Sequence, residues 1–285
     1  MRGFASSRLC VNPLLGRYQF TPGRKVAKNL KDTKPFTVNL VTTDAIVLRS
    51  YNLAEADRIV VCLTRDAGLV RAVAKGARRM KSRFGAALEP FTVIRLDFYE
   101  KENRDLVTIS RAEIVKSNFD LAAQLEVAEV LGYMAELIGE FAPPHEANDK
   151  LYRMLNACVE ALAAAPKAAT LVLRYFEVWM LRLAGSFPDV RECVACGTAL
   201  TTAQPLYVDF ESAVRCAKCS HGIGTALMPA IQQLLASSQR LSPSEFVNQY
   251  QASFTQSDAE LGDFTQRLIV RALERRPRTM VAPAR

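Results

Sequence analysis

Four of the seven cysteines form two Cys-x-x-Cys pairs, Cys193 with Cys196 and Cys216 with Cys219. Nineteen residues separate the pairs, which is a spacing typical of a four-cysteine zinc site. Two residues between paired ligands allow a tight turn to direct both thiolates at one ion, and residues 206–210 can form a strand that brings the second turn alongside. Four thiolates complete a tetrahedron and leave no place for a reacting water, so the pattern predicts a structural Zn²⁺ ion.

Three other uses of these cysteines receive less support. Two disulfides would need an oxidising compartment, which we do not expect because no apolar run of about 7–15 residues follows Arg2 as in a secretory signal. A redox dithiol would need only one pair, placed where a strand meets a helix. His221 follows Cys219 closely and is a conceivable ligand, but four cysteines already complete the site.

A second group of chemically capable residues lies in a basic segment, where six cations fall within thirteen residues without one acidic residue. These cations, the basic cluster, are Arg71, Lys75, Arg78, Arg79, Lys81 and Arg83. The segment follows a predicted strand and contains Gly76 and Gly85, so we expect an exposed, adaptable loop. Its cations can bind phosphates while Phe84, or else Tyr51 or Tyr99, stacks on a base. The alternatives are a solvated loop that aids solubility and a Phe84 ring that only anchors it.

The elements that must position these residues fall into two classes. Alternating apolar and polar residues predict five strands between residues 41 and 116, and five short strands in such a length favour a small barrel of the OB-fold type. The expected strands are Asp44–Tyr51, Arg58–Thr64, Leu69–Lys75, Thr92–Tyr99 and Leu106–Val115.

After Ser117 the apolar residues recur at helical spacing, with predicted helices over Asp120–Phe141, around Leu151–Leu162 and over Thr170–Ala184. A capping box, Ser242 to Glu245, opens a later helix. The sequence therefore predicts an α+β protein with an N-terminal five-stranded OB-fold barrel and a C-terminal α-helical domain that carries an inserted four-cysteine zinc module. The expected boundaries are 1–40 for a basic extension, 41–117 for the barrel, 118–190 and 224–285 for the two helical parts, and 191–223 for the zinc module.

The positive charge is concentrated near the N-terminus. The chain of 285 residues has 37 Lys and Arg against 29 Asp and Glu, a net charge of +8, yet residues 1–40 alone hold eight basic residues and one acid. The rest is almost neutral, so only a local cluster can argue for a polyanionic partner. We interpret residues 1–40 as a disordered extension; an organellar transit peptide and a basic arm that meets nucleic acid are the alternatives.

The sequence carries none of the common catalytic motifs. It has no phosphate-binding Gly-x-x-x-x-Gly-Lys, no Gly-x-Gly-x-x-Gly and no Gly-x-Ser-x-Gly. The pair His145-Glu146 begins like a zinc-protease motif, but Asp149 stands where the second histidine would be. No uncharged apolar run reaches the roughly 18 residues of a spanning helix. We therefore expect neither an enzyme nor an integral membrane protein.

From Thr43 to about Pro277 the chain resembles the RecO family of bacterial recombination mediators. The segments that carry the resemblance are Thr43–Arg49, Ala54–Arg58, Lys75–Arg79, Phe84–Phe91, Arg174–Glu177, Gly185–Pro188 and the two cysteine pairs, in the family's order.

The resemblance implies an OB-fold on a helical domain with a zinc module among the helices. It further implies a cytoplasmic, nucleoid-associated protein of DNA repair that binds single- and double-stranded DNA and anneals complementary strands. With RecR, and often RecF, such a protein helps to load RecA onto strands coated by single-strand-binding protein, whose acidic C-terminal tail it contacts.

Two rival functions from other classes fit parts of the same pattern. A zinc-ribbon module associated with RNA or transcription would share the barrel and the ion, and would differ by preferring RNA. A scaffold whose helices bind a partner peptide would leave the basic cluster idle and would show no affinity for DNA.

Overall fold

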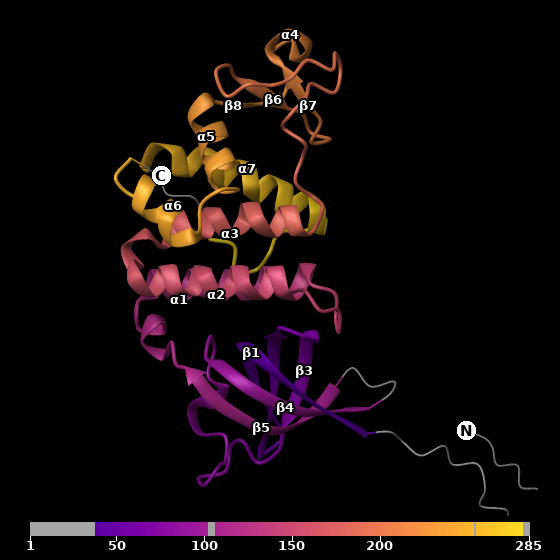
Figure 1. The fold of residues 1–285 in the computed structure, drawn as a ribbon, viewed down its shortest axis with the longest axis vertical. Coiled ribbons are helices and arrows are strands. Elements are labelled where there is room, and N and C mark those ends of the chain that lie inside the picture. Colours follow the sequence, from indigo (N-terminus) through magenta and orange to yellow (C-terminus); the bar gives the residue numbers. More distant parts are fainter. Residues whose placement is uncertain (1–37, 102–105, 254, 282–285) are drawn as a thin grey trace, which may run out of the picture. The chain divides into compact units, whose positions relative to one another are not determined.

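The computed structural model of the chain describes residues 38–101, 106–253 and 255–281. The chain divides into Met1–Phe36 and Thr37–Arg285, and the whole description below concerns the second unit (Figure 1). The basic extension expected over residues 1–40 thus lies outside the described residues up to residue 37. Its last three residues belong to a strand, because they pair with Tyr99, Glu100 and Lys101 of the barrel.

The N-terminal part is the predicted five-stranded barrel. Its strands are β1 (Val38–Leu53), β2 (Asp57–Thr64), β3 (Gly68–Ala74), β4 (Val93–Lys101) and β5 (Leu106–Lys116). They close in the order β1-β2-β3-β5-β4. All neighbours are antiparallel except β3 and β5, which pair in parallel from Arg71 opposite Leu106 to Val73 opposite Thr108. The predicted barrel is confirmed, and the alternation of apolar residues fills it with its own core.

A hairpin turn fastens the barrel to the segment that joins the first two long helices. Gly68 closes the β2–β3 turn with a φ of +66°, and a Cβ there would lie 2.1 Å from the Glu146 carbonyl oxygen. The backbone N–H of His145 donates to Leu69 O at 3.2 Å, and Arg65 Nε donates to Asp149 Oδ1 at 2.8 Å. Only glycine permits both the turn and this close approach.

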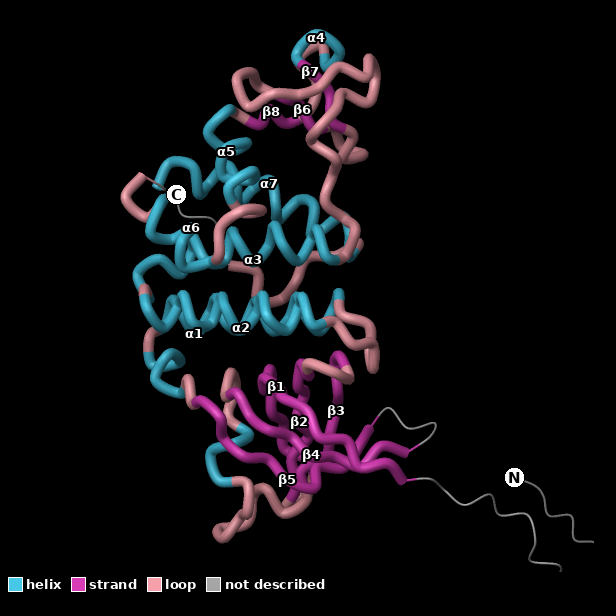
Figure 2. The backbone as a smooth tube through the Cα atoms, viewed as in Figure 1, coloured by secondary structure: helices cyan, strands magenta, loops and turns pink. Residues whose placement is uncertain are grey.

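The helical part contains α1 (Leu125–Phe141), α2 (Asp149–Ala164), α3 (Ala169–Leu183), α5 (Pro229–Ser237), α6 (Pro243–Tyr250) and α7 (Thr255–Leu273). Their apolar faces form one large core. Figure 2 shows how these helices are arranged along the backbone. Short 3₁₀ turns occur at η1 (Gly85–Leu88), η2 (Phe119–Ala123) and η3 (Pro166–Ala168). The predicted capping box at Ser242 and Glu245 is present. The first predicted helix starts five residues late because η2 occupies its first turn.

A small module is inserted between α3 and α5. It consists of β6 (Leu206–Val208), β7 (Val214–Cys216), the helical turn α4 (Ala217–Ser220) and β8 (Thr225–Leu227), with strand order β7-β6-β8. The inserted four-cysteine module is thereby confirmed as part of the fold. Its sheet ends at Leu227, four residues past the predicted boundary, because β8 is needed to pair with β6. None of the helices in the described ranges is long and apolar enough to cross a lipid bilayer.

Candidate metal centre and nucleic-acid interface

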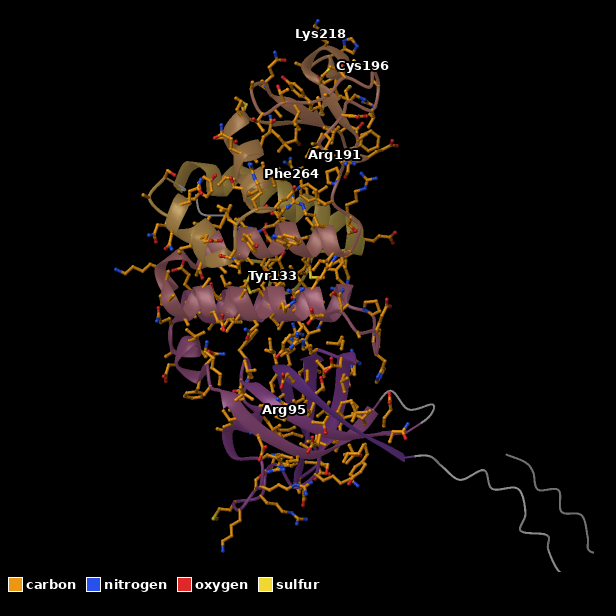
Figure 3. All side chains as sticks on the ribbon, viewed as in Figure 1. Arg95, Tyr133, Arg191, Cys196, Lys218 and Phe264 are labelled. Atoms are coloured by element: carbon orange, nitrogen blue, oxygen red, sulfur yellow. The ribbon has the colours of Figure 1, made fainter. Side chains whose placement is uncertain are left out.

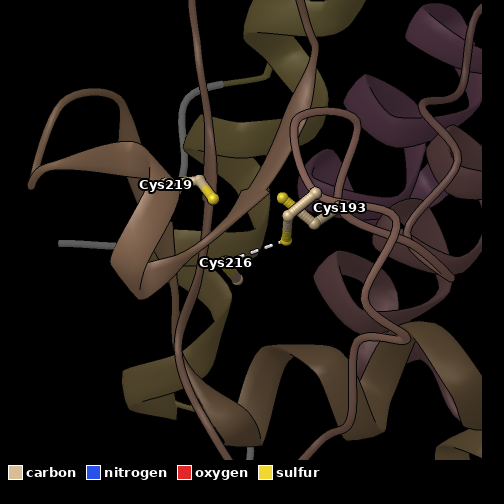
Figure 4. Close-up of side chains that lie close together, drawn as sticks. Cys193, Cys216 and Cys219 are labelled. Carbon is tan, nitrogen blue, oxygen red and sulfur yellow. Dashed lines mark hydrogen bonds between the residues drawn. The ribbon is translucent and has the colours of Figure 1, made fainter.

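The four cysteines of the inserted module converge on one point. Cys193 and Cys196 lie on a turn that Gly197 closes with a φ of +65°, while Cys216 ends β7 and Cys219 lies in α4. All four Sγ atoms lie within 4.8 Å of one another. Figure 4 shows the side chains of Cys193, Cys216 and Cys219 directed toward a common centre. The structure thus brings together the whole predicted ligand set, and His221 is not among the grouped ligands.

The geometry and the ionisation of this cluster fit a metal ion. Cys196 Sγ and Cys216 Sγ are 3.9 Å apart, close to the roughly 3.8 Å edge of a tetrahedron with metal–sulfur bonds of about 2.3 Å. Backbone N–H groups of Cys216, Ala195 and Cys196 lower the pKa of the Cys193 thiol to about 6. Hydrogen bonds shared with Cys216 and Cys196 raise the pKa of Cys219 to about 12.

Four thiolates within 4.8 Å of one another repel strongly, so the four sulfurs cannot all ionise unless a cation compensates their charge. The donor set is four soft sulfur ligands with no carboxylate. The four cysteines can therefore bind a metal ion. Four sulfur ligands fill the tetrahedral coordination shell and leave no open position for a substrate or a reacting water.

The basic cluster lies on the barrel surface and on the loop that follows β3. Arg71 is exposed on β3, and Lys75, Arg78, Arg79, Lys81 and Arg83 are exposed on the turns between β3 and η1. Within the described part of the chain, no carboxylate forms an ion pair with any of the six. Met80, at the middle of the loop, is fully exposed. The structure therefore presents unneutralised positive charge to solvent.

The base of this loop is held by the turn between β1 and β2. Gly76 N–H donates to Asp57 Oδ1 at 2.8 Å, and Arg78 donates twice to that turn, from its backbone N–H to Ala56 O at 2.9 Å and from Nη1 to Ala54 O at 2.8 Å. Carbonyl oxygens orient the Arg78 guanidinium without cancelling its charge. The loop is thus anchored at its start, while the side chains of Arg79 and Lys81 form no hydrogen bond or ion pair with the described residues.

Phe84 does not offer its ring to solvent. The side chain is 3% exposed and packs in the barrel core with Ala87, Leu88 and Phe98. The Arg83 guanidinium lies 4.9 Å from the ring centroid and covers it further. The structure therefore assigns Phe84 to the anchoring role named above as the alternative, and its burial leaves no face for a base. Tyr51 and Tyr99 remain exposed on the barrel, at 48% and 39%.

The sequence did not predict one further feature, a cavity where the inserted module meets α7. Phe210 and Arg271 both line it although they lie 61 positions apart in the chain. No local spacing could have linked them; the one sequence signal was an apolar Phe210 between two acidic residues.

Comparison with known proteins gives matches over both parts of the fold. The family model described as "Recombination protein O N terminal" matches residues 38–118, and "Recombination protein O C terminal" matches residues 124–280. The division between the two matches falls at η2, where the barrel gives way to the helices.

Curated relatives carry the name DNA repair protein RecO. The protein of Koribacter versatilis is 38% identical over 161 residues, covering 56% of this chain and 65% of that protein. The protein of Anaeromyxobacter sp. strain K is 35% identical over 196 residues, covering 69% and 77% respectively. The protein of Bifidobacterium longum strain DJO10A is 39% identical over 177 residues, covering 61% and 72%.

Proposed function

The chain belongs to the RecO family, and from this membership we propose that it acts in DNA repair as a DNA-binding recombination mediator. It binds single- and double-stranded DNA and anneals complementary strands. The observation that carries the proposal is the set of six exposed cations on the barrel, none of which a carboxylate neutralises among the described residues.

The proposed mechanism is electrostatic. Two complementary strands repel one another through their phosphates, and a loop rich in Lys and Arg lowers that repulsion where it binds, with release of counterions. Arg79 and Lys81 extend beyond the anchored start of the loop and can follow the backbone of a moving strand. With Phe84 buried, the loop contacts phosphates rather than bases. The base edges then stay free to pair.

The remaining assignments follow from the same proposal. The ion held by the four cysteines is a structural Zn²⁺, which would fold the inserted module rather than supply chemistry. The protein has no catalytic activity of its own. It works in the bacterial cytoplasm with RecR, and with RecF where present, to place RecA on strands coated by single-strand-binding protein, whose acidic tail it contacts.

Strand annealing by the full chain tests this function. The test variant replaces Arg78, Arg79 and Lys81 with Ala, and the control replaces Lys150, Lys167 and Arg240 with Ala, which removes the same charge from exposed positions elsewhere. We expect the loop variant to anneal labelled complementary strands about tenfold more slowly and the control to match the wild type. Equal rates for all three proteins would contradict the proposal. Annealing of bare strands but not of strands coated by single-strand-binding protein would refute only the mediator role.

A further inference from the structure

The cavity between the inserted module and α7 combines an apolar wall with two cations. It measures 420 Å³, within the range of about 300–1,000 Å³ common for ligand sites. Val208 of β6 and Phe264 and Leu268 of α7 form the apolar wall. The labels in Figure 3 locate Phe264 on α7 and Cys196 in the inserted module. Both parts of the cavity belong to the same packed core.

Phe210 stands at the rim of this cavity with 87% of its surface exposed. The turn that carries it is tightly held. Asp209 Oδ1 accepts hydrogen bonds from the backbone N–H groups of Glu211 and Ala213, both at 2.9 Å, and Arg271 Nη1 donates to Phe210 O at 2.6 Å and to Ser212 Oγ at 2.9 Å. A large apolar ring is thus kept in water on a rigid turn, which is the arrangement of a preformed stacking platform.

Two arginines of α7 line the cavity, and Arg271 also binds the turn that carries Phe210. Arg267 and Arg271 lie one helical turn apart on α7, and both line the cavity. Arg267 Nε donates to the Asp263 carbonyl oxygen at 3.0 Å, and neither arginine forms an ion pair with any carboxylate of the described ranges. Asp209, which also lines the cavity, is paired with Arg215 at 3.1 Å. Arg267 and Arg271 therefore present two cations without an ion pair to an anion in the cavity, while Glu211 is exposed next to Phe210 on the turn.

We propose that this cavity is a second site for single-stranded nucleic acid, in which Phe210 stacks on a base and Arg267 and Arg271 bind consecutive phosphates. The inference rests on the proposed function, because annealing brings two strands together and the basic cluster forms one continuous site. The two sites share no residue, since one is built from β3 and the loop after it and the other from the β6–β7 turn, β8 and α7.

An exposed ring favours a nucleic-acid strand over an acidic peptide. A peptide anchor would fill the cavity and would need the apolar wall, whereas stacking needs an accessible aromatic face with cations beside it. Phe210 offers that face at the rim. Phe210→Leu therefore distinguishes the two occupants. A leucine would preserve apolar contact with a peptide but could not stack on a base.

The test measures how many oligonucleotides one full-length chain binds, with fluorescently labelled poly-dT titrated at low salt. We expect two strands per chain for the wild type and for Phe210→Tyr. The variants Phe210→Leu and Phe210→Ala/Arg267→Gln should retain the first strand within about twofold and lose the second by about tenfold, with a similar loss in annealing rate. Phe119→Ala, which removes another exposed ring at 63% exposure, is the matched control and should behave as the wild type.

The outcomes separate this inference from the proposed function. If the Phe210 variants still bind two strands and anneal normally, the second site is refuted while the function stands. If Phe210→Leu binds two strands like the wild type, stacking is not required and the inference fails. The inference also fails if an acidic peptide binds the wild type more tightly than Phe210→Ala/Arg267→Gln without displacing a strand. The cavity is then a peptide site. If the wild type binds no strand at all, the proposed function itself is refuted.

Discussion

Glu136 fastens the end of the described chain to α1. Its side chain is 5% exposed, and its carboxylate accepts hydrogen bonds from the backbone N–H groups of Arg278 at 2.8 Å and Thr279 at 2.7 Å. Gln266 of α7 holds the same segment by donating to Val281 O at 2.5 Å. One buried carboxylate thus satisfies backbone donors that would otherwise be left without partners.

The stability contributed by Glu136 should depend on pH. Burial opposes ionisation, but hydrogen bonds from Thr279 and Arg278 outweigh it and hold the pKa of Glu136 below its ordinary value of 4.5. Because the folded-state pKa is the lower one, the contribution is complete above pH 4.5 and is lost as the pH falls through the folded-state pKa. We expect Glu136→Gln to lower the free energy of unfolding by about 2 kcal/mol at pH 7 and by much less below pH 4.

Urea denaturation at several pH values measures this difference. Glu140→Gln is the control, since Glu140 forms a partly exposed ion pair with Arg275. We expect this substitution to lower the free energy of unfolding by less than about 1 kcal/mol. If Glu136→Gln lowers the free energy of unfolding by the same amount from pH 7 to pH 3, the charge of Glu136 does not contribute to stability.

Residues differ in how far the sequence alone reveals their roles. The four cysteines were predictable because their spacing along the chain is itself the geometric requirement of the site. The burial of Phe84 was not predictable, since it depends on packing against residues that several strands bring together. Phe210 and Arg271 meet only through the packing of the inserted module on α7, so no sequence pattern could pair them.

At the scale of elements, the inserted module is packed onto the helices rather than attached by a linker. Leu206, Val208, Val214 and Leu227 belong to the same core as the helical faces, and Gln232 of α5 donates to Gln204 O and Leu227 O at 2.7 and 2.8 Å. The barrel keeps a separate core of its own. An ion that organises the module should therefore support α5 and α7 more than the barrel.

Removal of the metal should destabilise the helical part first. Chelation, or Cys196→Ser, breaks the tetrahedral set, and the module can then no longer hold its strands against α5 and α7. We expect calorimetry to resolve an early transition that hydrogen exchange assigns to α5 and α7, while β1 to β5 stay protected. Lys218→Ser changes an exposed residue between two ligands and should leave the trace unaltered. Identical traces with and without metal would contradict this coupling.

The elements themselves were largely predictable because their patterns are local. Strand alternation predicted all five barrel strands, with ends that differ by a few residues where a partner strand extends the pairing, as at Val38. The 3₁₀ turn over Phe119–Ala123 was missed, because its apolar residues continue the helical spacing of α1. Closure of the barrel through β3 and β5 depends on long-range pairing and was inferred from strand number rather than from sequence.

For the whole molecule, the distribution of charge matters more than its sum. The chain carries +8, but residues after position 40 are nearly neutral in total. We therefore assign the DNA affinity of the barrel to the basic cluster and not to a general positive field. Variants that remove equal charge from different places should then differ strongly in their response to salt.

A salt titration of single-strand binding by the full chain measures how many phosphate contacts the basic cluster makes. Each phosphate contact contributes about 0.7 to the slope of log K against log salt concentration. Replacing Arg78, Arg79 and Lys81 with Ala should reduce the magnitude of that slope by about 2, whereas replacing Lys150, Lys167 and Arg240 with Ala should leave it unchanged. A slope for the loop variant equal to that of the wild type would show that the basic cluster does not contact the phosphates.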